Sequence, residues 1–250
     1  MFEKFAQNLD RLVKIMEHLR DPVTGCDWDR VQTFATIAPY TIEEAYEVAD
    51  AIARDDMASL ADELGDLQLQ VVFHSQMARE AGHFTLNDVL AGVCDKLERR
   101  HPHIFGDAAA SPGWEALKAA ERNTNEDQSA LAGVALALPA LERAAKLQKR
   151  AARTGFDWPD ETGPRAKIEE ELAELAEAAP ADRAEELGDL LFAVVNLARH
   201  LKIDPEDALR LANRKFERRF RAIETAPGFS SLSLEDMEIL WQAAKADQSA

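Results

Sequence analysis

The chain contains the pentapeptide Glu-Leu-Gly-Asp-Leu twice, at 63–67 and again at 186–190. Other short stretches recur in the same order around the two copies. The matched pairs are Arg11, Lys14 and Ile15 with Arg143, Lys146 and Leu147, GCDWD at 25–29 with GFDWP at 155–159, EEAYE at 43–47 with EELAE at 170–174, KLERR at 96–100 with KFERR at 215–219, and WEALK at 114–118 with WQAAK at 241–245. Matches in a fixed order are typical of a duplicated structural unit. The sequence therefore predicts two related domains.

The polar segment ERNTNEDQSA at 121–130 separates the two sets of matches. We place the domain boundary there, which gives a first domain over 1–124 and a second over 125–250. A chain of 250 residues is long enough for two small domains, each with a core of its own.

Helical periodicity runs through both halves, and Gly and Pro are scarce at 11 and 10 residues. No alternating apolar stretch bounded by turn signals indicates a strand. We therefore predict an all-α fold made of two related helical bundles. The expected helices are 2–20, 38–54, 57–80, 85–100, 113–122, 138–152, 165–178, 182–201, 205–225 and 233–246.

The formal net charge of −17 argues against nucleic-acid binding, because such a surface repels phosphates. No apolar stretch is long enough for a membrane span, and the N-terminus does not resemble a signal peptide. Two cysteines, Cys26 and Cys94, are too few for a disulfide framework or a metal cluster. We expect them to be small core or boundary residues of a cytoplasmic protein.

Acidic residues at helical spacing are the strongest chemical signal. Glu171 and Glu174 share one side of a predicted helix, and Glu186 and Asp189 share one side of the next. A short turn between antiparallel helices would bring the four carboxylates together. Clustered carboxylates repel one another, and a hard divalent cation such as Mg²⁺ relieves the repulsion; Mn²⁺ suits the same oxygen ligands.

The first half offers the same four acids and therefore a possible second site: Glu44, Glu47, Glu63 and Asp66. Two plainer interpretations remain open for such residues. Glutamates on helices are usually solvated, and Thr41 with Glu44 can form a capping box. The residues after Asp189 are apolar on every side of the helix, which predicts that this helix is largely buried. Carboxylates at its start would then need a partner, either a metal or basic side chains.

Basic and aromatic residues form a second cluster of candidates. Lys215, Arg218 and Arg219 lie on one face of a predicted helix, and such residues bind phosphate well. Trp241 and Lys245 are four residues apart and can hold a base and a phosphate. The alternatives are an ion-pair network for the basic face and ordinary core packing for Trp241.

The acidic pattern, Glu-Glu-x-x-Glu followed by Glu-x-x-Asp, resembles the all-α nucleoside triphosphate pyrophosphohydrolases, and in particular the two-domain MazG family. The stretches that carry the resemblance cover most of the chain: GCDWDRVQTFATIAPYTIEEAYEVADAIA, DKLERRHPHIFGD, GFDW and GDLLFAVVNLARHL. The resemblance implies Mg²⁺-dependent hydrolysis of nucleoside triphosphates to the monophosphate and pyrophosphate, by a helical homodimer.

Site residues follow from the same resemblance. It implies that the metal ligands and catalytic residues are Glu171, Glu174, Glu186 and Asp189. It also implies a set of nucleotide-binding residues: Lys167, Glu170, Glu171, Glu185, Asp189, Lys215, Arg218, Arg219, Trp241 and Lys245. Near Arg183 the resemblance is poorer, because the turn here is shorter.

We expect the second half to hold the principal site. It has Lys167 four residues before Glu171, where the first half has Tyr40, and Arg183 where the first half has Leu60. The additional positive charge suits a triphosphate. We hypothesise that the metal lowers the pKa of a bound water, that Glu171 helps to take its proton, and that the basic face stabilises the departing pyrophosphate.

Other functions stay open on the sequence alone. The substrate range can be broad, or narrow as in a dUTP or phosphoribosyl-ATP pyrophosphohydrolase. The chain can also be a non-catalytic nucleotide-sensing helical dimer whose acids are ion-paired. The presence of all four acids in both halves weighs against the last interpretation.

Overall fold

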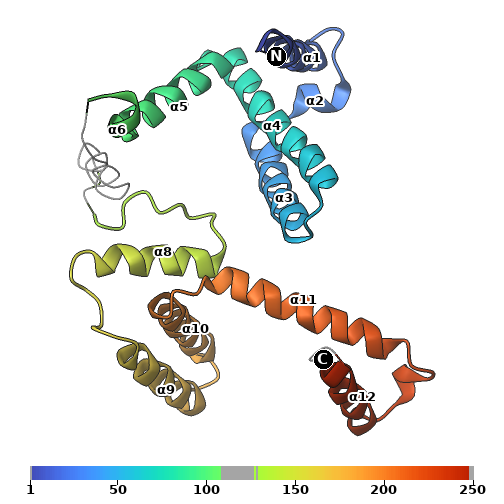
Figure 1. Cartoon of the computed structure of the whole chain (residues 1–250), viewed down its shortest axis with the longest axis vertical. Coiled ribbons are helices and arrows are strands. Elements are labelled where there is room, and N and C mark those ends of the chain that lie inside the picture. The colour runs from blue at the N-terminus through green and yellow to red at the C-terminus, as the bar shows by residue number, and fades with distance from the viewer. Residues whose placement is uncertain (1, 108–126, 128, 248–250) are drawn as a thin grey trace. The chain divides into compact units, whose positions relative to one another are not determined.

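The computed structural model describes residues 2–107, 127 and 129–247, and over these ranges it contains helices and loops but no strand (Figure 1). The chain divides into two compact units, 1–118 and 119–250. The all-α fold and its two related helical units are confirmed. The boundary between 124 and 125 and the expected helix 113–122 lie outside the described residues, so both stay predictions.

Unit 1 is built around a hairpin of two long helices, α3 (Phe34–Ala53) and α4 (Met57–Glu80). A three-residue connection joins them and takes Asp55 into the left-handed region at φ 56°. Asp56 then caps α4, because its side chain accepts a hydrogen bond from the backbone N–H of Ser59. The tight connection holds the two helices side by side (Figure 1).

The core of unit 1 forms where α1 (Phe2–Leu19) packs on α4. The residues of this core are Met16, Ile37, Val72, Phe73 and Met77. The short α2 (Asp27–Val31) follows α1, and α5 (Leu86–Arg100) and α6 (Pro102–Phe105) follow α4. Burial of these apolar side chains stabilises the hairpin on one flank.

Unit 2 repeats this plan. Its hairpin consists of α9 (Thr162–Glu177) and α10 (Arg183–His200), and α8 (Ala140–Ala152) packs on α10 as α1 packs on α4. The long α11 (Pro205–Glu224) follows, and after the 3₁₀ turn Phe229–Ser231 the last helix, α12 (Leu234–Asp247), packs against α11 (Figure 1).

The start of α9 depends on a glycine. A Cβ atom at Gly163 would lie 2.2 Å from the indole ring of Trp158, so only glycine lets that ring pack over the first turn. Asp157 directly precedes Trp158 in the sequence and accepts hydrogen bonds from Arg199 on α10. The GFDW segment is therefore fastened to both helices of the hairpin.

Most of the predicted helices in the described ranges are confirmed, with shifts at their ends. Helix α3 begins at Phe34 and not at residue 38, because Thr33 and Thr36 form a capping box. The short α2, α6 and the 3₁₀ turn were not predicted, since three to five residues carry too little periodicity to be recognised.

The sequence predicts that the helix containing Asp189 and the apolar residues after it is largely buried. This prediction is wrong for this chain. Ala193 and Val195 are buried, but Leu191 is 49% exposed and Leu187, Phe192 and Val194 are also exposed. Helix α10 is covered by α8 and α9 on part of its circumference only. The exposed stripe consists of Leu187, Leu191 and Val194, and we call it the α10 stripe.

Two smaller expectations can also be compared with the structure. Cys26 and Cys94 are free thiols, as expected, but both are exposed, so neither is a core residue. In the described part of the chain, no helix combines the length and the apolar character needed to cross a bilayer.

Candidate active site

Carboxylates from both helices of the unit 2 hairpin meet near its turn. Glu171 and Glu174 come from α9 and Glu186 comes from the first turn of α10, and each offers an oxygen within 4.8 Å of the others. Asp189 lies one turn further along α10, on the same side. The structure therefore brings together three of the four acids that the spacing of the sequence singled out, and the role of all four as metal ligands stays a prediction.

Glu171 is the most unusual member of this cluster, because it is only 3% exposed. Its Oε1 atom lies 2.5 Å from the ammonium nitrogen of Lys167. Its Oε2 atom is fully buried and has no hydrogen-bond partner in the described structure. An ionised carboxylate with an unsatisfied buried oxygen is costly, so this atom is suited to bind a cation.

The electrostatics of the cluster are consistent with a missing positive charge. Burial raises the pKa of the Glu186 carboxyl, and repulsion from Glu174, Glu171 and Asp189 raises that pKa further. Hydrogen bonds from its amine to Glu170 and then to Glu171 raise the pKa of Lys167 and keep it charged. One lysine does not balance this many acids, and a divalent cation would.

Oxygen ligands in this arrangement fit a hard divalent cation. Glu171, Glu174 and Glu186 supply carboxylate oxygens that converge on one place, and Mg²⁺ is usually bound through carboxylates, waters and substrate phosphates. The orphan oxygen of Glu171 gives the cation a reason to bind there. The residues therefore fit the group that the sequence predicts.

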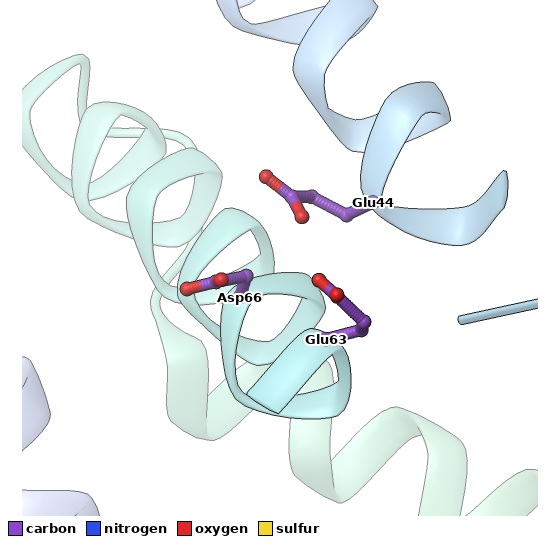
Figure 2. A group of neighbouring side chains, drawn as sticks. All are labelled: Glu44, Glu63 and Asp66. Atoms are coloured by element: carbon purple, nitrogen blue, oxygen red, sulfur yellow. The ribbon is translucent and has the colours of Figure 1, made fainter. Parts of the chain in front are cut away.

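The hairpin of unit 1 carries a second acidic cluster. Glu44 on α3 and Glu63 and Asp66 on α4 gather within 4.8 Å, and Figure 2 shows their carboxylates turned into the space between the two helices. Burial and the charge of Asp66 raise the pKa of Glu44, and burial and the charge of Glu47 raise that of Glu63. The repeat thus preserves the cluster as well as the helices.

A cavity of about 750 Å³ lies beside the acids of unit 2. Lys167, Glu171 and Asp189 line one end, so the cavity and the acidic cluster are continuous. The remaining wall is mainly aromatic and apolar: Leu131, Leu147, Gln148, Ala151, Gly155, Phe156, Asp157, Trp158, Phe192, Ala193, Asn196 and Arg199. This volume falls in the range of small-molecule sites.

A polar network forms part of the cavity lining. The guanidinium of Arg199 donates to Asp157 at 2.9 Å and to the Oδ1 atom of Asn196 at 2.7 Å. The hydrogen bond from Arg199 lowers the pKa of the Asp157 carboxyl. His200 lies 3.1 Å from the same carboxylate.

This cavity wall was not predicted from the sequence. Phe156 and Trp158 were noted only as part of the repeat, and Gln148, Asn196 and Arg199 were not singled out. The available signal was the stripe of Asp189, Phe192, Asn196 and Arg199, which repeats along one face of α10. A polar residue amid an apolar run marks such a face.

The predicted basic face lies elsewhere in unit 2. Lys215, Arg218 and Arg219 belong to α11, and none of them lines the cavity described above. The guanidinium carbon of Arg219 lies 6.0 Å from the ring centre of Trp241, which packs against Phe216 at 5.3 Å. Ordinary core packing was the plainer interpretation of Trp241, which is half-buried here.

The remaining predicted residues are placed as follows. Glu170 is exposed and pairs with Lys167 at 2.8 Å, and Glu185 and Arg183 are exposed at the start of α10. Lys245 is exposed near the end of α12. Within one chain, only Lys167, Glu171 and Asp189 of the predicted nucleotide-binding residues line the cavity. The nucleotide-binding role of the others stays a prediction.

Fold and site together define an all-helical protein with a duplicated hairpin and a candidate divalent-metal site in each copy. The family model of the MazG nucleotide pyrophosphohydrolase domain matches residues 32–105 and 162–223. These ranges include both hairpins and both acidic clusters. The chain belongs to the MazG nucleotide pyrophosphohydrolase family.

Three relatives extend this result. A protein from Escherichia coli K12 named nucleoside triphosphate pyrophosphohydrolase is 53% identical over 255 residues, which cover 95% of this chain and 97% of that protein. One from Thermotoga maritima, named nucleoside triphosphate pyrophosphohydrolase/pyrophosphatase MazG, is 47% identical over 94% of this chain and 95% of its own length. A nucleoside triphosphate pyrophosphohydrolase from Mycobacterium tuberculosis is 32% identical, over 84% of this chain and 60% of its own length.

Proposed function

We propose that this chain is a divalent-metal-dependent nucleoside triphosphate pyrophosphohydrolase that releases the monophosphate and pyrophosphate and accepts several bases. The single observation that carries the proposal is Glu171. Its buried, unpartnered Oε2 atom lies where the acidic cluster meets the cavity. The names of the relatives support the reaction.

The second half supplies the residues for this chemistry. Glu171, Glu174, Glu186 and Asp189 would hold Mg²⁺, or Mn²⁺ in its place. A bound divalent ion supplies Lewis-acid polarisation of phosphate oxygens and a water of lowered pKa. Lys167 lies at the entrance between acids and cavity, where its charge attracts the phosphates.

The aromatic part of the cavity suits the nucleoside. Phe156, Trp158 and Phe192 each expose ring surface to it, and stacking on such rings is tolerant of base identity. This arrangement favours a broad range of bases over a single substrate. The Lys215–Arg219 face and Trp241 would contact the nucleotide only if they approach the cavity in an assembled or closed form.

We further propose that the chain forms a homodimer. The α10 stripe exposes Leu187, Leu191 and Val194, and Leu64 and Val71 are exposed on α4 of unit 1. Apolar residues in a row are typical of helical contacts between subunits. Leu191→Asp should give a monomer in sedimentation analysis, while an unchanged dimer would rule out this face.

Two free thiols support the expected reducing, cytoplasmic location.

One assay tests the reaction directly. Pyrophosphate release is measured from each common NTP and dNTP, with Mg²⁺, with Mn²⁺ and with a chelator. We expect release from several substrates and none with the chelator. Release from dUTP alone would replace the broad enzyme with a narrow one. An absence of release from every substrate would favour a nucleotide-sensing protein.

A further inference from the structure

Two buried amides are among the residues that line the cavity. Gln148 comes from α8 and is 6% exposed, and Asn196 comes from α10 and is 9% exposed. Buried amides in proteins are nearly always fully hydrogen-bonded, so any atom that lacks a partner needs an explanation.

The orientation of the Gln148 amide is fixed by its neighbour. Its Nε2 atom donates to the backbone carbonyl of Phe192 at 2.8 Å. A carbonyl oxygen only accepts, so the nitrogen must face Phe192 and Oε1 must point the other way. That Oε1 atom is fully buried and has no partner among the described residues. Gln148 is a lining residue, so an acceptor without a partner lies beside the cavity.

Asn196 presents a hydrogen-bond donor where Gln148 presents an acceptor. Its Oδ1 atom accepts from Nε of Arg199 at 3.1 Å and from Nη2 at 2.7 Å. A guanidinium only donates, so the oxygen must face Arg199 and the Nδ2 group faces away from it. Asp157 holds Arg199 in place at 2.9 Å. Asn196 is thus left with a donor to offer to the cavity.

The position of this pair suits the base of a nucleotide whose phosphates lie at the acids. Asn196 lies two turns beyond Asp189 on the same face of α10, which is about 10 Å along the helix axis. Phe192 and Trp158 provide ring surface around the same space. A base that stacks there would turn its hydrogen-bonding edge toward the amides.

We propose that Gln148 and Asn196 read the Watson–Crick edge of the base. Gln148 accepts from an N–H group of the base, and Asn196 donates to the neighbouring ring nitrogen or carbonyl. Adenine, cytosine and uracil each have a donor followed by an acceptor on this edge, so one fixed pair holds them in one orientation, whereas guanine has the two in reverse order and must turn over to meet the same pair. A base that lacks the donor leaves Gln148 unsatisfied and is rejected. This inference rests on the proposed function, because it requires a nucleotide in this cavity.

The proposed recognition of the base can be tested with ATP and purine riboside triphosphate. The second nucleotide lacks the amino group of adenine and is otherwise the same. For the full chain with Mg²⁺ we expect kcat/KM to favour ATP by about tenfold or more. Gln148→Met places in unit 2 the residue that unit 1 has at the matching position, Met16. In this variant the preference should fall to about one, through a loss with ATP alone.

A second variant separates the donor from the acceptor. Asn196→Asp keeps an oxygen for Arg199 and removes the Nδ2 donor. Both substrates carry the ring nitrogen that this donor would contact, so both should lose about tenfold while the ATP preference stays. Gln76→Met is the matched control, since Gln76 is a buried amide in unit 1 that donates to Glu80. It should behave as the unmodified chain.

Dissociation constants for the same two nucleotides, measured by calorimetry, give the ratio without any turnover. If no triphosphate releases pyrophosphate but the binding ratio follows Gln148, the proposed function fails and the base reading holds. The base reading is overturned if the unmodified chain shows no preference, if Gln148→Met keeps the preference, or if that variant weakens both nucleotides equally.

Discussion

Met16 and Phe73 in the first half occupy the positions that Gln148 and Asn196 hold in the second, as the matched stretches around them show. Met16 and Phe73 are 1% and 4% exposed and belong to the core of unit 1. Trp28, which matches Trp158, packs edge-on against Phe73 at 6.5 Å. Gln148 and Asn196 instead line a cavity of about 750 Å³.

The two halves thus share a hairpin with an acidic cluster, and in the second half residues of that cluster also line a cavity of about 750 Å³. Both hairpins gather three carboxylates within 4.8 Å. Apolar side chains beside the first cluster pack into a core, which lowers the free energy of folding. Polar side chains line the cavity beside the second cluster, and the buried Oε1 atom of Gln148 has no partner among the described residues. This contrast between a packed core and a cavity favours hydrolysis in the second half. The additional lysine of that half led to the same prediction from the sequence.

The largest expected effect separates the two acidic clusters. Glu186→Gln should lower pyrophosphate release by at least about a hundredfold, because it removes a charged carboxylate that we propose as a metal ligand. Glu63→Gln, the matched change in the first half, should leave release within about twofold. Steady-state assays on both variants, with circular dichroism to confirm helical folding, make the comparison. Equal losses would show that both halves turn over substrate.

A second experiment makes the second half resemble the first. Asn196→Phe places a ring where unit 1 has Phe73, and it should fill the cavity and lower kcat/KM by about tenfold to a hundredfold. The acids are unchanged, so we expect Mg²⁺ to raise Tm by the same amount in this variant and in the unmodified chain. Full activity in this variant would mean that the nucleoside binds outside the cavity.

A third experiment measures how much each residue contributes to stability. Phe73→Ala removes a buried ring and should cost about 3–5 kcal/mol in the free energy of unfolding. Asn196→Ala should cost about 1 kcal/mol, because it removes hydrogen bonds from Arg199 that Asp157 partly replaces. Urea unfolding followed by circular dichroism gives both values. Similar costs would contradict the assignment of one position to a core and the other to a cavity.

The smallest expected effect concerns pH. Burial lowers the pKa of His74 below 6.5, where the imidazole lies 3.1 Å from the hydroxyl of Thr41 and stacks on Phe34. The folded state therefore favours neutral His74. Its contribution to stability is present above the ordinary pKa and is lost as the pH falls through the lowered one.

The matched position in the second half is Leu197, so this pH effect belongs to unit 1 alone. Calorimetry should show Tm falling by about 2 °C more between pH 7 and pH 5 in the unmodified chain than in His74→Gln. An identical fall in both proteins would remove His74 as the cause.

Much of the fold was predictable because it depends on local signals. Helix α4 begins and ends as predicted, since Asp56 provides a cap and the apolar residues recur at helical spacing. The acidic clusters were predictable for the same reason: acids three residues apart share one helix face, and a short connection fixes which faces meet. The cavity depends on contacts between α8, α9 and α10, and no local spacing reports such contacts.

The sequence by itself determined the helices, the duplication and the four acids that each half presents at its hairpin. Only the tertiary structure decided what lies beside those acids, namely a closed core against Phe73 in one half and an open cavity against Asn196 in the other. The physical reason is that helix periodicity fixes the face on which a residue lies. Whether that face meets apolar atoms, polar groups or empty space depends on the helices packed against it.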